Sequence, residues 1–225
     1  MKLWLPLARV GARIWSDWPD SAYKHQHYRD RLKTVQDHLS ECLDNAHEGP
    51  LRIISICAGD GRDIIDVLHS HHRRNDVTAW LVELNAYSVD AGQRRATAAG
   101  LAGIVNFLHC DATTFAAYKE IYPADIVLLC GVWGHVPATD RQMFAGALAA
   151  LCRPGAMVVW TRGVAGDFRR FADIDAVFTG PSWQKVRVSF TSSRKWAIVT
   201  NRYVGPTGKV PDDGRLFHFR RCAGT

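Results

Sequence analysis

The sequence predicts an α/β protein with a doubly wound, mostly parallel sheet of seven strands, an antiparallel C-terminal hairpin and an N-terminal helical cap. Three observations lead to this prediction. From residue 51 to about 161, short apolar runs alternate with segments of helical periodicity. The run at 125–130 is almost continuously apolar, as in strands buried on both faces. Two alternating segments joined by the polar link 191–195 then indicate the hairpin.

Two regions are expected along the chain: a helical cap or lid at 1–49, and one globular cofactor-binding unit at 50–225. In the cap, apolar residues recur at spacings of three and four, which predicts one helix whose apolar face carries Tyr28, Leu32, Val35, Leu39 and Leu43. Gly49-Pro50 is expected to end this region.

The remaining elements follow from the same patterns. Strands are predicted at about 51–58, 77–83, 105–108, 125–130, 157–161, 186–190 and 197–204. Helices are predicted at about 62–71, 86–99, 112–121, after a cap at Thr139, and at 167–178.

Composition narrows the class of protein. The 225 residues carry a net charge of +6, but the basic residues occur in short pairs, so a nucleic-acid partner is not expected. The six cysteines include no C-x-x-C pair, and several lie in apolar strand patterns, which predicts reduced thiols and a cytoplasmic protein. No apolar run is long enough to cross a membrane, and the first residues do not form a convincing signal peptide. The sequence is compatible with a homodimer.

The most informative segment is 51–68. Its apolar run meets a glycine turn, Gly59-Asp60-Gly61, and a helical pattern begins at Ile64. A strand, a tight loop and a helix in this order place backbone N–H groups and the positive end of a helix beside an anionic or polar ligand. The alternative is a turn that merely needs glycine dihedral angles.

A carboxylate further along the chain supports the interpretation that this loop binds a ligand. Glu83 ends the strand 77–83, 22 residues after Gly61, where an acid can bind the two hydroxyls of a ribose. The two features together predict a cofactor that contains a nucleoside. NAD is disfavoured, because Ile64 stands where the dinucleotide pattern requires a third glycine.

Over about residues 50–204 the chain resembles the class I S-adenosylmethionine (SAM)-dependent methyltransferases. The segments that carry the resemblance, in the family's order and approximate spacing, are Ala58-Gly59-Asp60-Gly61, Glu83, Cys110-Asp111-Ala112 and Cys130-Gly131-Val132-Trp133. The wording ISICAGDGRD is similar to that of a little-described bacterial group of small methyltransferases. The resemblance implies a Rossmann-like methyltransferase fold, SAM as cofactor and methyl transfer to a small organic acceptor.

The resemblance also implies a set of cofactor-binding residues. Backbone of Ala58, Gly59, Asp60 and Gly61 should approach the amino-acid part of SAM. Glu83, with Leu84 beside it, should bind the ribose, Asp111 and Ala112 the adenine, and Cys130 and Gly131 should lie near the sulfonium.

The chain departs from the family at two positions. Cys57 replaces an acid two positions before the first glycine, and Asp63 replaces a third glycine. The SAM ammonium must then use other carbonyls or carboxylates.

Candidates for catalysis and acceptor binding are fewer. His135 follows the fourth strand and could act as a general base, the alternative being a loop histidine bonded to backbone. Trp133 could form a wall of the acceptor pocket or pack in the core. Tyr23 and Tyr28 could belong to a lid over the acceptor, or to an amphipathic helix resting on the sheet.

No metal site is predicted, because His69 and His72 fit a solvated helix end better than a ligand set. Two alternative functions remain open: a SAM-binding protein that does not transfer methyl groups, and a nucleic-acid methyltransferase. Against the latter, the fourth strand ends in Cys130-Gly131-Val132-Trp133 rather than in an N-P-P-Y-like tetrapeptide.

Overall fold

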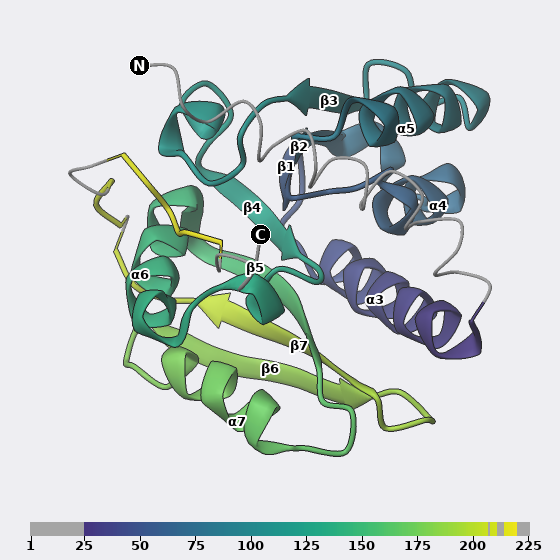
Figure 1. Ribbon diagram of the computed structural model, residues 1–225. Coiled ribbons are helices and arrows are strands. Elements are labelled where there is room, and N and C mark those ends of the chain that lie inside the picture. The colour runs from purple at the N-terminus through teal and green to yellow at the C-terminus, as the bar shows by residue number, and fades with distance from the viewer. Residues whose placement is uncertain (1–24, 207, 211–213, 220–225) are drawn as a thin grey trace, which may run out of the picture.

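The computed structural model describes residues 25–206, 208–210 and 214–219 (Figure 1). The strands are β1 (Leu51–Ile56), β2 (Val77–Glu83), β3 (Val105–His109), β4 (Ala124–Leu129), β5 (Cys152–Gly163), β6 (Trp183–Phe190) and β7 (Trp196–Tyr203). The helices are α3 (Gln26–Asp44), α4 (Arg62–Ser70), α5 (Ala86–Ala98), α6 (Arg141–Leu151) and α7 (Arg169–Asp175). Short 3₁₀ turns are η1 (Arg74–Asp76), η2 (Phe115–Tyr118), η3 (Trp133–His135), η4 (Ala138–Asp140) and η5 (Ala176–Phe178).

All seven strands form one sheet in the order β3-β2-β1-β4-β5-β7-β6. The first five are parallel, and β7 runs antiparallel to both β5 and β6. The doubly wound sheet and the antiparallel hairpin predicted from the sequence are therefore confirmed. The strand order reverses between β1 and β4, and open α/β sheets generally bind ligands outside the carboxyl ends of their strands at such a point.

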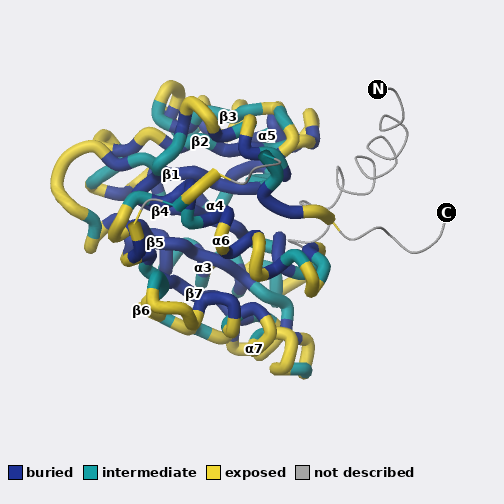
Figure 2. Tube along the Cα trace, turned by 90° about the vertical axis from the view of Figure 1, so that its left-hand side faces the viewer, coloured by how far each residue is buried: buried dark blue, intermediate teal, exposed yellow. Residues whose placement is uncertain are grey.

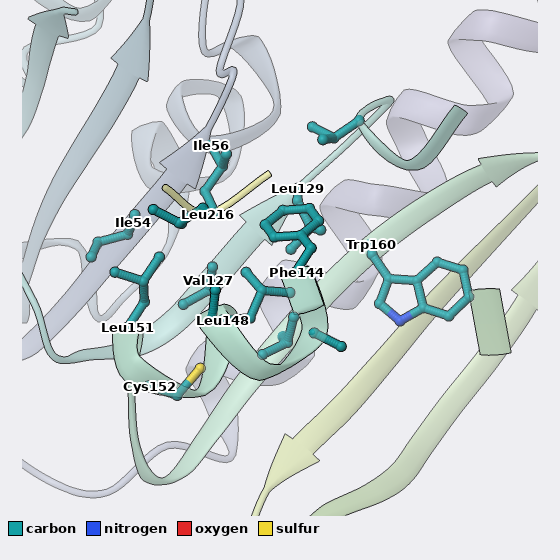
Figure 3. Close-up of a cluster of buried hydrophobic side chains, with 14 of the residues drawn as sticks. Ile54, Ile56, Val127, Leu129, Phe144, Leu148, Leu151, Cys152, Trp160 and Leu216 are labelled. Carbon is teal, nitrogen blue, oxygen red and sulfur yellow. The ribbon is translucent and has the colours of Figure 1, made fainter. Parts of the chain in front are cut away.

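Alternate residues of the strands feed two separate hydrophobic layers. Ile53, Ile126 and Leu128 pack with α3, α4 and α5. Ile54 and Val127 face the opposite layer, where Figure 3 shows them close to side chains of α6 and to the buried Leu216. In Figure 2 the chain along β1, β4 and β5 is largely buried. Because the central strands are buried on both faces, their carboxyl tips are held rigidly.

Helix α3 rests on the sheet as part of one layer: Val35, Leu39 and Leu43 share a core with β1 and α4. Its buried face differs from the expected one. Leu32 is only half-buried, whereas Arg31 and His38 lie on the buried side. The part of the expected cap that contains Tyr23 lies outside the described residues.

Several elements differ from expectation, among them three between residues 112 and 178. The predicted helix at 112–121 is a loop with the 3₁₀ turn η2, because Phe115, Tyr118 and Ile121 are buried at intervals of three. The predicted helix at 167–178 divides into α7 and η5. Thr139 does not cap α6; it lies in η4, and its hydroxyl donates to the Asp140 carboxylate at 2.8 Å.

The segment 214–219 returns to the sheet and covers part of its carboxyl edge. Leu216 and Phe217 are fully buried. The backbone N–H of Leu216 donates to the carbonyl of Thr113 at 2.8 Å, and the ring of Phe217 lies 4.3 Å from that of Phe144 in α6. None of the described helices is long and apolar enough to cross a membrane.

Candidate functional site

The loop between β1 and α4 has an unusual backbone. Cys57, Gly59 and Gly61 all have positive φ, at 55°, 58° and 66°. The strand predicted to reach residue 58 therefore ends at Ile56. Residue 63 is in the first turn of α4, and the third left-handed residue is Cys57.

The two glycines are needed for different reasons. A Cβ built on Gly59 would meet no heavy atom within 4 Å, so the loop faces open space there. A Cβ on Gly61 would collide with the Leu81 side chain and lie 3.0 Å from Cζ of Phe107. Gly61 thus lets the loop pack on the sheet, and Gly59 lets the loop backbone approach a ligand.

Glu83 is fixed at the tip of β2 by backbone groups. Its Oε2 accepts from the Gly59 N–H at 2.8 Å, and its Oε1 accepts from the Asn85 N–H at 2.8 Å. Asn85 in turn caps α5, accepting from the N–H groups of Tyr87 and Ser88. Each carboxylate oxygen keeps further lone pairs, which two vicinal hydroxyls of a ribose could use.

Asp111 follows β3 and is exposed, with Oδ1 accepting from both the N–H (2.9 Å) and the hydroxyl (2.7 Å) of Thr113. It shares its surroundings with Glu83. Burial raises the pKa of the Cys57 thiol, and the charges of Glu83 and Asp111 raise it further. The phenol of Tyr118 shows the same pattern, its pKa raised by burial and by these acids. The two acids therefore converge on one region.

Three other expected cofactor residues have distinct environments. Leu84 has 53% of its side chain exposed beside Glu83, whereas Ala112 is buried. Asp60 is engaged by arginines: both of its oxygens lie 2.9 Å from Nε of Arg62, and Arg95 approaches to 3.7 Å. Leu84 thus presents exposed apolar surface beside Glu83, whereas the Asp60 carboxylate is already paired with arginines.

The ends of β4 and β5 are joined at Gly131, whose N–H donates to the Thr161 hydroxyl at 2.8 Å. A Cβ on Gly131 would lie 3.4 Å from Nη1 of Arg31, so the guanidinium sits over this backbone. Burial raises the pKa of the neighbouring Cys130 thiol, and the nearby Asp63 charge raises it further.

Trp133 does not face an open pocket. Its side chain is fully buried and packs against Phe144 and Phe178, with ring centroids at 4.8 and 5.7 Å. Of the two readings of this residue, the structure shows core packing, because η3 turns the ring under the sheet edge.

His135 is exposed at the end of η3. Its backbone N–H donates to the Val132 carbonyl at 2.9 Å, and its ring lies 6.4 Å from that of Phe219. Tyr28 lies at the start of α3, beside the Trp196 ring at 5.5 Å. Both residues flank the end of the sheet where the β4 and β5 tips lie.

Sequence reasoning missed Arg31, Asp63 and Thr161. A signal for Arg31 existed, since it falls three residues after Tyr28 and four before Val35, on the apolar stripe of the helix. Asp63 stood out only as a missing glycine. Thr161 lies in an ordinary strand pattern, so nothing in the sequence marks it.

Among the described residues, Asp44, His71 and His72 are close enough together to hold a metal ion. The backbone N–H of Arg73 donates to Nδ1 of His71 at 3.2 Å, which leaves the proton of the neutral ring on Nε2, 3.3 Å from Asp44. This arrangement is an ion-pair contact between an imidazole and a carboxylate, and it lies at the opposite edge of the sheet from Glu83.

A nucleoside cofactor fits the carboxyl edge. The loop presents an open glycine, a carboxylate with spare lone pairs stands at the next strand tip, and a second acid lies at the third. Ala58 belongs to the same loop; its N–H donates to the Val82 carbonyl at 3.1 Å and binds β1 to β2 below the site.

Comparison with known proteins agrees with this geometry. A family described as "Putative methyltransferase" matches residues 18–164, more than half of the chain. Over 115 residues the chain is 28% identical to tRNA 5-carboxymethoxyuridine methyltransferase of Escherichia coli (strain K12), which covers 50% of this chain and 41% of that protein. The chain thus spans about two fifths of the length of the curated relatives it matches.

Two solved structures show the shared fold. Magnesium protoporphyrin IX methyltransferase (ChlM) from Synechocystis PCC 6803 with bound SAM has a TM-score of 0.65 at 16% identity, covering 90% of this chain and 100% of that one. The [4+2]-cyclase SpnF has a TM-score of 0.54 at 15% identity, covering 75% and 82%. The chain therefore belongs to this methyltransferase family, and it shares the Rossmann-like fold of these solved structures.

Proposed function

We propose that this chain transfers the methyl group of SAM to a small organic acceptor at the carboxyl edge of the sheet. The observation that supports this most is the placement of Glu83. Its carboxylate is bound to the glycine loop of β1 while it stands at the tip of β2, beside the region that Asp111 shares. A nucleoside bound there would lie across the point where the strand order reverses.

Each strand tip has a role in holding the cofactor. Glu83 binds the ribose hydroxyls, with Leu84 against the base. Asp111 accepts from the exocyclic amine of the adenine, with Ala112 beneath it. The backbone from Ala58 to Gly61 faces the amino-acid part, and Cys130 and Gly131 line the space near the sulfonium.

The cofactor supplies a methyl group that its sulfonium has already activated. The protein must hold an acceptor in line with that group, and alignment of this kind can lower a barrier by about 7–11 kcal/mol in favourable cases. The hydrogen bond between Gly131 and Thr161 joins the tips of β4 and β5, which keeps the floor of the acceptor space fixed.

His135 is the general base in this proposal. The exposed imidazole after β4 supports this role, since it would take the proton of an acceptor hydroxyl or amine as that atom attacks. Such a base contributes a factor of about 10²–10⁴ to turnover when the acceptor must lose a proton.

The test combines an acceptor panel with one substitution. Purified protein is incubated with methyl-labelled SAM and a panel of phenols, carboxylic acids, amines and thiols, and labelled product is counted. His135→Ala should lower turnover by about 10²-fold or more while affinity for S-adenosylhomocysteine (SAH) stays the same. His72→Ala, at an exposed histidine of the opposite edge, is the matched control. Unchanged turnover in His135→Ala would remove this residue from the mechanism.

RNA is a second candidate acceptor, favoured by the similarity to the tRNA methyltransferase. Enzymes that modify a base commonly stack it on an aromatic ring, and Trp133, the aromatic residue closest in sequence to the β4 tip, is buried in the core. Total tRNA therefore belongs in the same panel. Methylation of tRNA that weakens steeply with salt would replace the small acceptor with RNA.

The same fold occurs in a cyclase, so the fold does not by itself determine the reaction. SAH binding without label transfer to any acceptor, tRNA included, would contradict methyl transfer and favour a SAM-binding protein of another function.

A further inference from the structure

The amino-acid end of SAM carries an ammonium and a carboxylate, so a complete site needs a charge of each sign to receive it. The sequence leaves both unassigned, because Cys57 is uncharged where many relatives of this fold place an acid. The structure offers three acidic side chains around the glycine loop: Asp60, Asp63 and Glu83.

Two of these acids are already engaged. Asp60 is paired with Arg62, whose Nε lies 2.9 Å from both carboxylate oxygens, and with Arg95. Glu83 accepts from the backbone N–H groups of the loop and of Asn85, and it is committed to the ribose side.

Asp63 is the third. It sits in the first turn of α4, and its Oδ1 accepts from the N–H of Ile64 at 3.0 Å. It interacts electrostatically with Arg31 of α3 and with Cys130 at the end of β4. The carboxylate therefore lies between the glycine loop and the β4 tip.

Arg31 supplies the opposite charge at the same place. Arg31 is buried, with 7% of its surface exposed, and its Nη1 lies over Gly131. The guanidinium carbon stands 4.9 Å from the ring centre of Trp196 and 5.8 Å from that of Tyr28. Ring faces hold a guanidinium in place while its N–H donors stay in its own plane, in the geometry that suits a carboxylate.

We propose that Arg31 and Asp63 receive the amino-acid end of SAM: the guanidinium binds the cofactor carboxylate, and the Asp63 carboxylate binds the ammonium. The inference rests on the proposed cofactor site at the carboxyl edge and completes it. It also gives α3 a function beyond packing, because this helix brings one of the two charges to the strand tips. The replacement of glycine by Asp63 then compensates for the missing acid at Cys57.

The electrostatic environment of Asp63 is consistent with its binding the ammonium of the cofactor. Burial raises the pKa of Asp63 to about 6, Asp60 raises it slightly, and the Ile64 N–H and Arg31 lower it. A half-buried carboxylate whose ionisation is opposed by desolvation gains from a cationic ligand. Affinity for SAH should accordingly rise with pH as Asp63 ionises through about 6, while the Cys130 thiol stays neutral.

The test is a calorimetric cycle that pairs side-chain changes with ligand truncations. The ligands are SAH, SAH lacking only its carboxylate, SAH lacking only its amino group, and methylthioadenosine, which lacks the whole amino-acid end. Wild-type protein should bind SAH at least 10-fold more tightly than methylthioadenosine. Arg31→Met should lose most of that preference, and removal of the ligand carboxylate should then have no further effect. Asp63→Asn should behave in the same way toward the amino group.

Matched controls are Lys33→Met on α3 and Asp66→Asn on α4, both exposed and one short step along the same helices. They should bind all four ligands as the wild type does. If Arg31→Met fails to fold, Arg31→Lys keeps the charge without the planar fork and should retain only part of the carboxylate preference.

The outcomes separate two failures. Equal loss of SAH and methylthioadenosine binding in Arg31→Met, or a preference that survives in both variants, would overturn this inference alone. Wild-type protein that binds neither SAH nor methylthioadenosine would overturn the proposed cofactor site itself.

Discussion

Polar side chains at the two edges of the sheet differ in how many of their hydrogen bonds are made within the protein. At the amino edge, Asp125 accepts from the Arg52 N–H at 2.7 Å and from Nη1 of Arg153 at 3.1 Å, and Nε2 of His47 lies 3.1 Å away. At the carboxyl edge, Glu83 accepts two backbone bonds and keeps lone pairs for a ligand, next to a glycine that faces open space. We expect polar groups whose hydrogen bonds are all made within the protein to contribute to stability, and groups with lone pairs still available to contribute to ligand binding.

The largest effect should come from the amino edge. Asp125→Ala leaves the Arg52 N–H and the Arg153 guanidinium without their acceptor, so the free energy of unfolding should fall by about 2–4 kcal/mol. Urea unfolding measures this loss. Affinity of the folded protein for SAH should not change. A loss of affinity as large as the loss of stability would show that the two edges are not independent.

At the carboxyl edge, Glu83→Gln should lower the affinity for SAH and leave the stability of the fold nearly unchanged. A hydrogen bond to a charged group contributes about 1.5–3 kcal/mol, so SAH affinity should fall by about 10–100-fold. The midpoint of thermal unfolding should move little, since Gln still accepts a backbone bond. Glu120→Gln, at an exposed acid, serves as the control. Calorimetry with SAH and with adenosine should show the same loss for both, because the ribose is common to them.

His38, in the interface between α3 and the sheet, is another polar side chain whose hydrogen-bonding atoms both have partners within the protein. Its ring nitrogens lie 2.7 Å from the Thr200 hydroxyl and 2.9 Å from the Ser189 hydroxyl. Burial, and next the Arg187 charge, lower its pKa to about 4, while Glu41 and Asp37 oppose the shift.

On acidification, His38 therefore binds a proton near pH 6.5 in the unfolded chain, but only near pH 4 in the folded protein. Stability should fall as the pH drops through this window, by about 1.4 kcal/mol per pH unit. His38→Gln should flatten that slope, measured by urea unfolding at several pH values. The same slope in the variant would assign the effect to other groups.

The smallest and most direct test uses two glycines that flank β1. Gly49 and Gly59 have positive φ, at 88° and 58°, and a Cβ on either meets no heavy atom within 4 Å. Alanine at either position should reduce stability by about 1–2 kcal/mol through backbone strain. Only Gly59→Ala should also weaken SAH binding. Equal SAH affinity in the two variants would mean that the loop backbone does not approach the cofactor.

Much of the fold could be predicted because its signals are local. Apolar runs located β2 and β4, and Glu83 was visible as an acid at a strand tip. The end of β1 was not predictable, because Cys57 adopts a left-handed backbone that only the surrounding loop requires. Arg31 was missed because helical periodicity favoured Leu32 for the buried face, whereas packing against Trp196 selected the arginine.

The segment 214–219 gave no sequence signal, since it has neither helical nor strand periodicity, yet it spans the site edge. Arg215 donates to the Thr113 hydroxyl at 2.9 Å near Asp111, and Nδ1 of His218 lies 2.8 Å from the Asp140 carboxylate just past η3. Phe219 ends this bridge with its ring 6.4 Å from that of His135. Under the proposed function, a fluorinated phenylalanine introduced at position 219 would thus act as a spectroscopic reporter, because a cofactor near Asp111 and an acceptor near His135 would each change its surroundings.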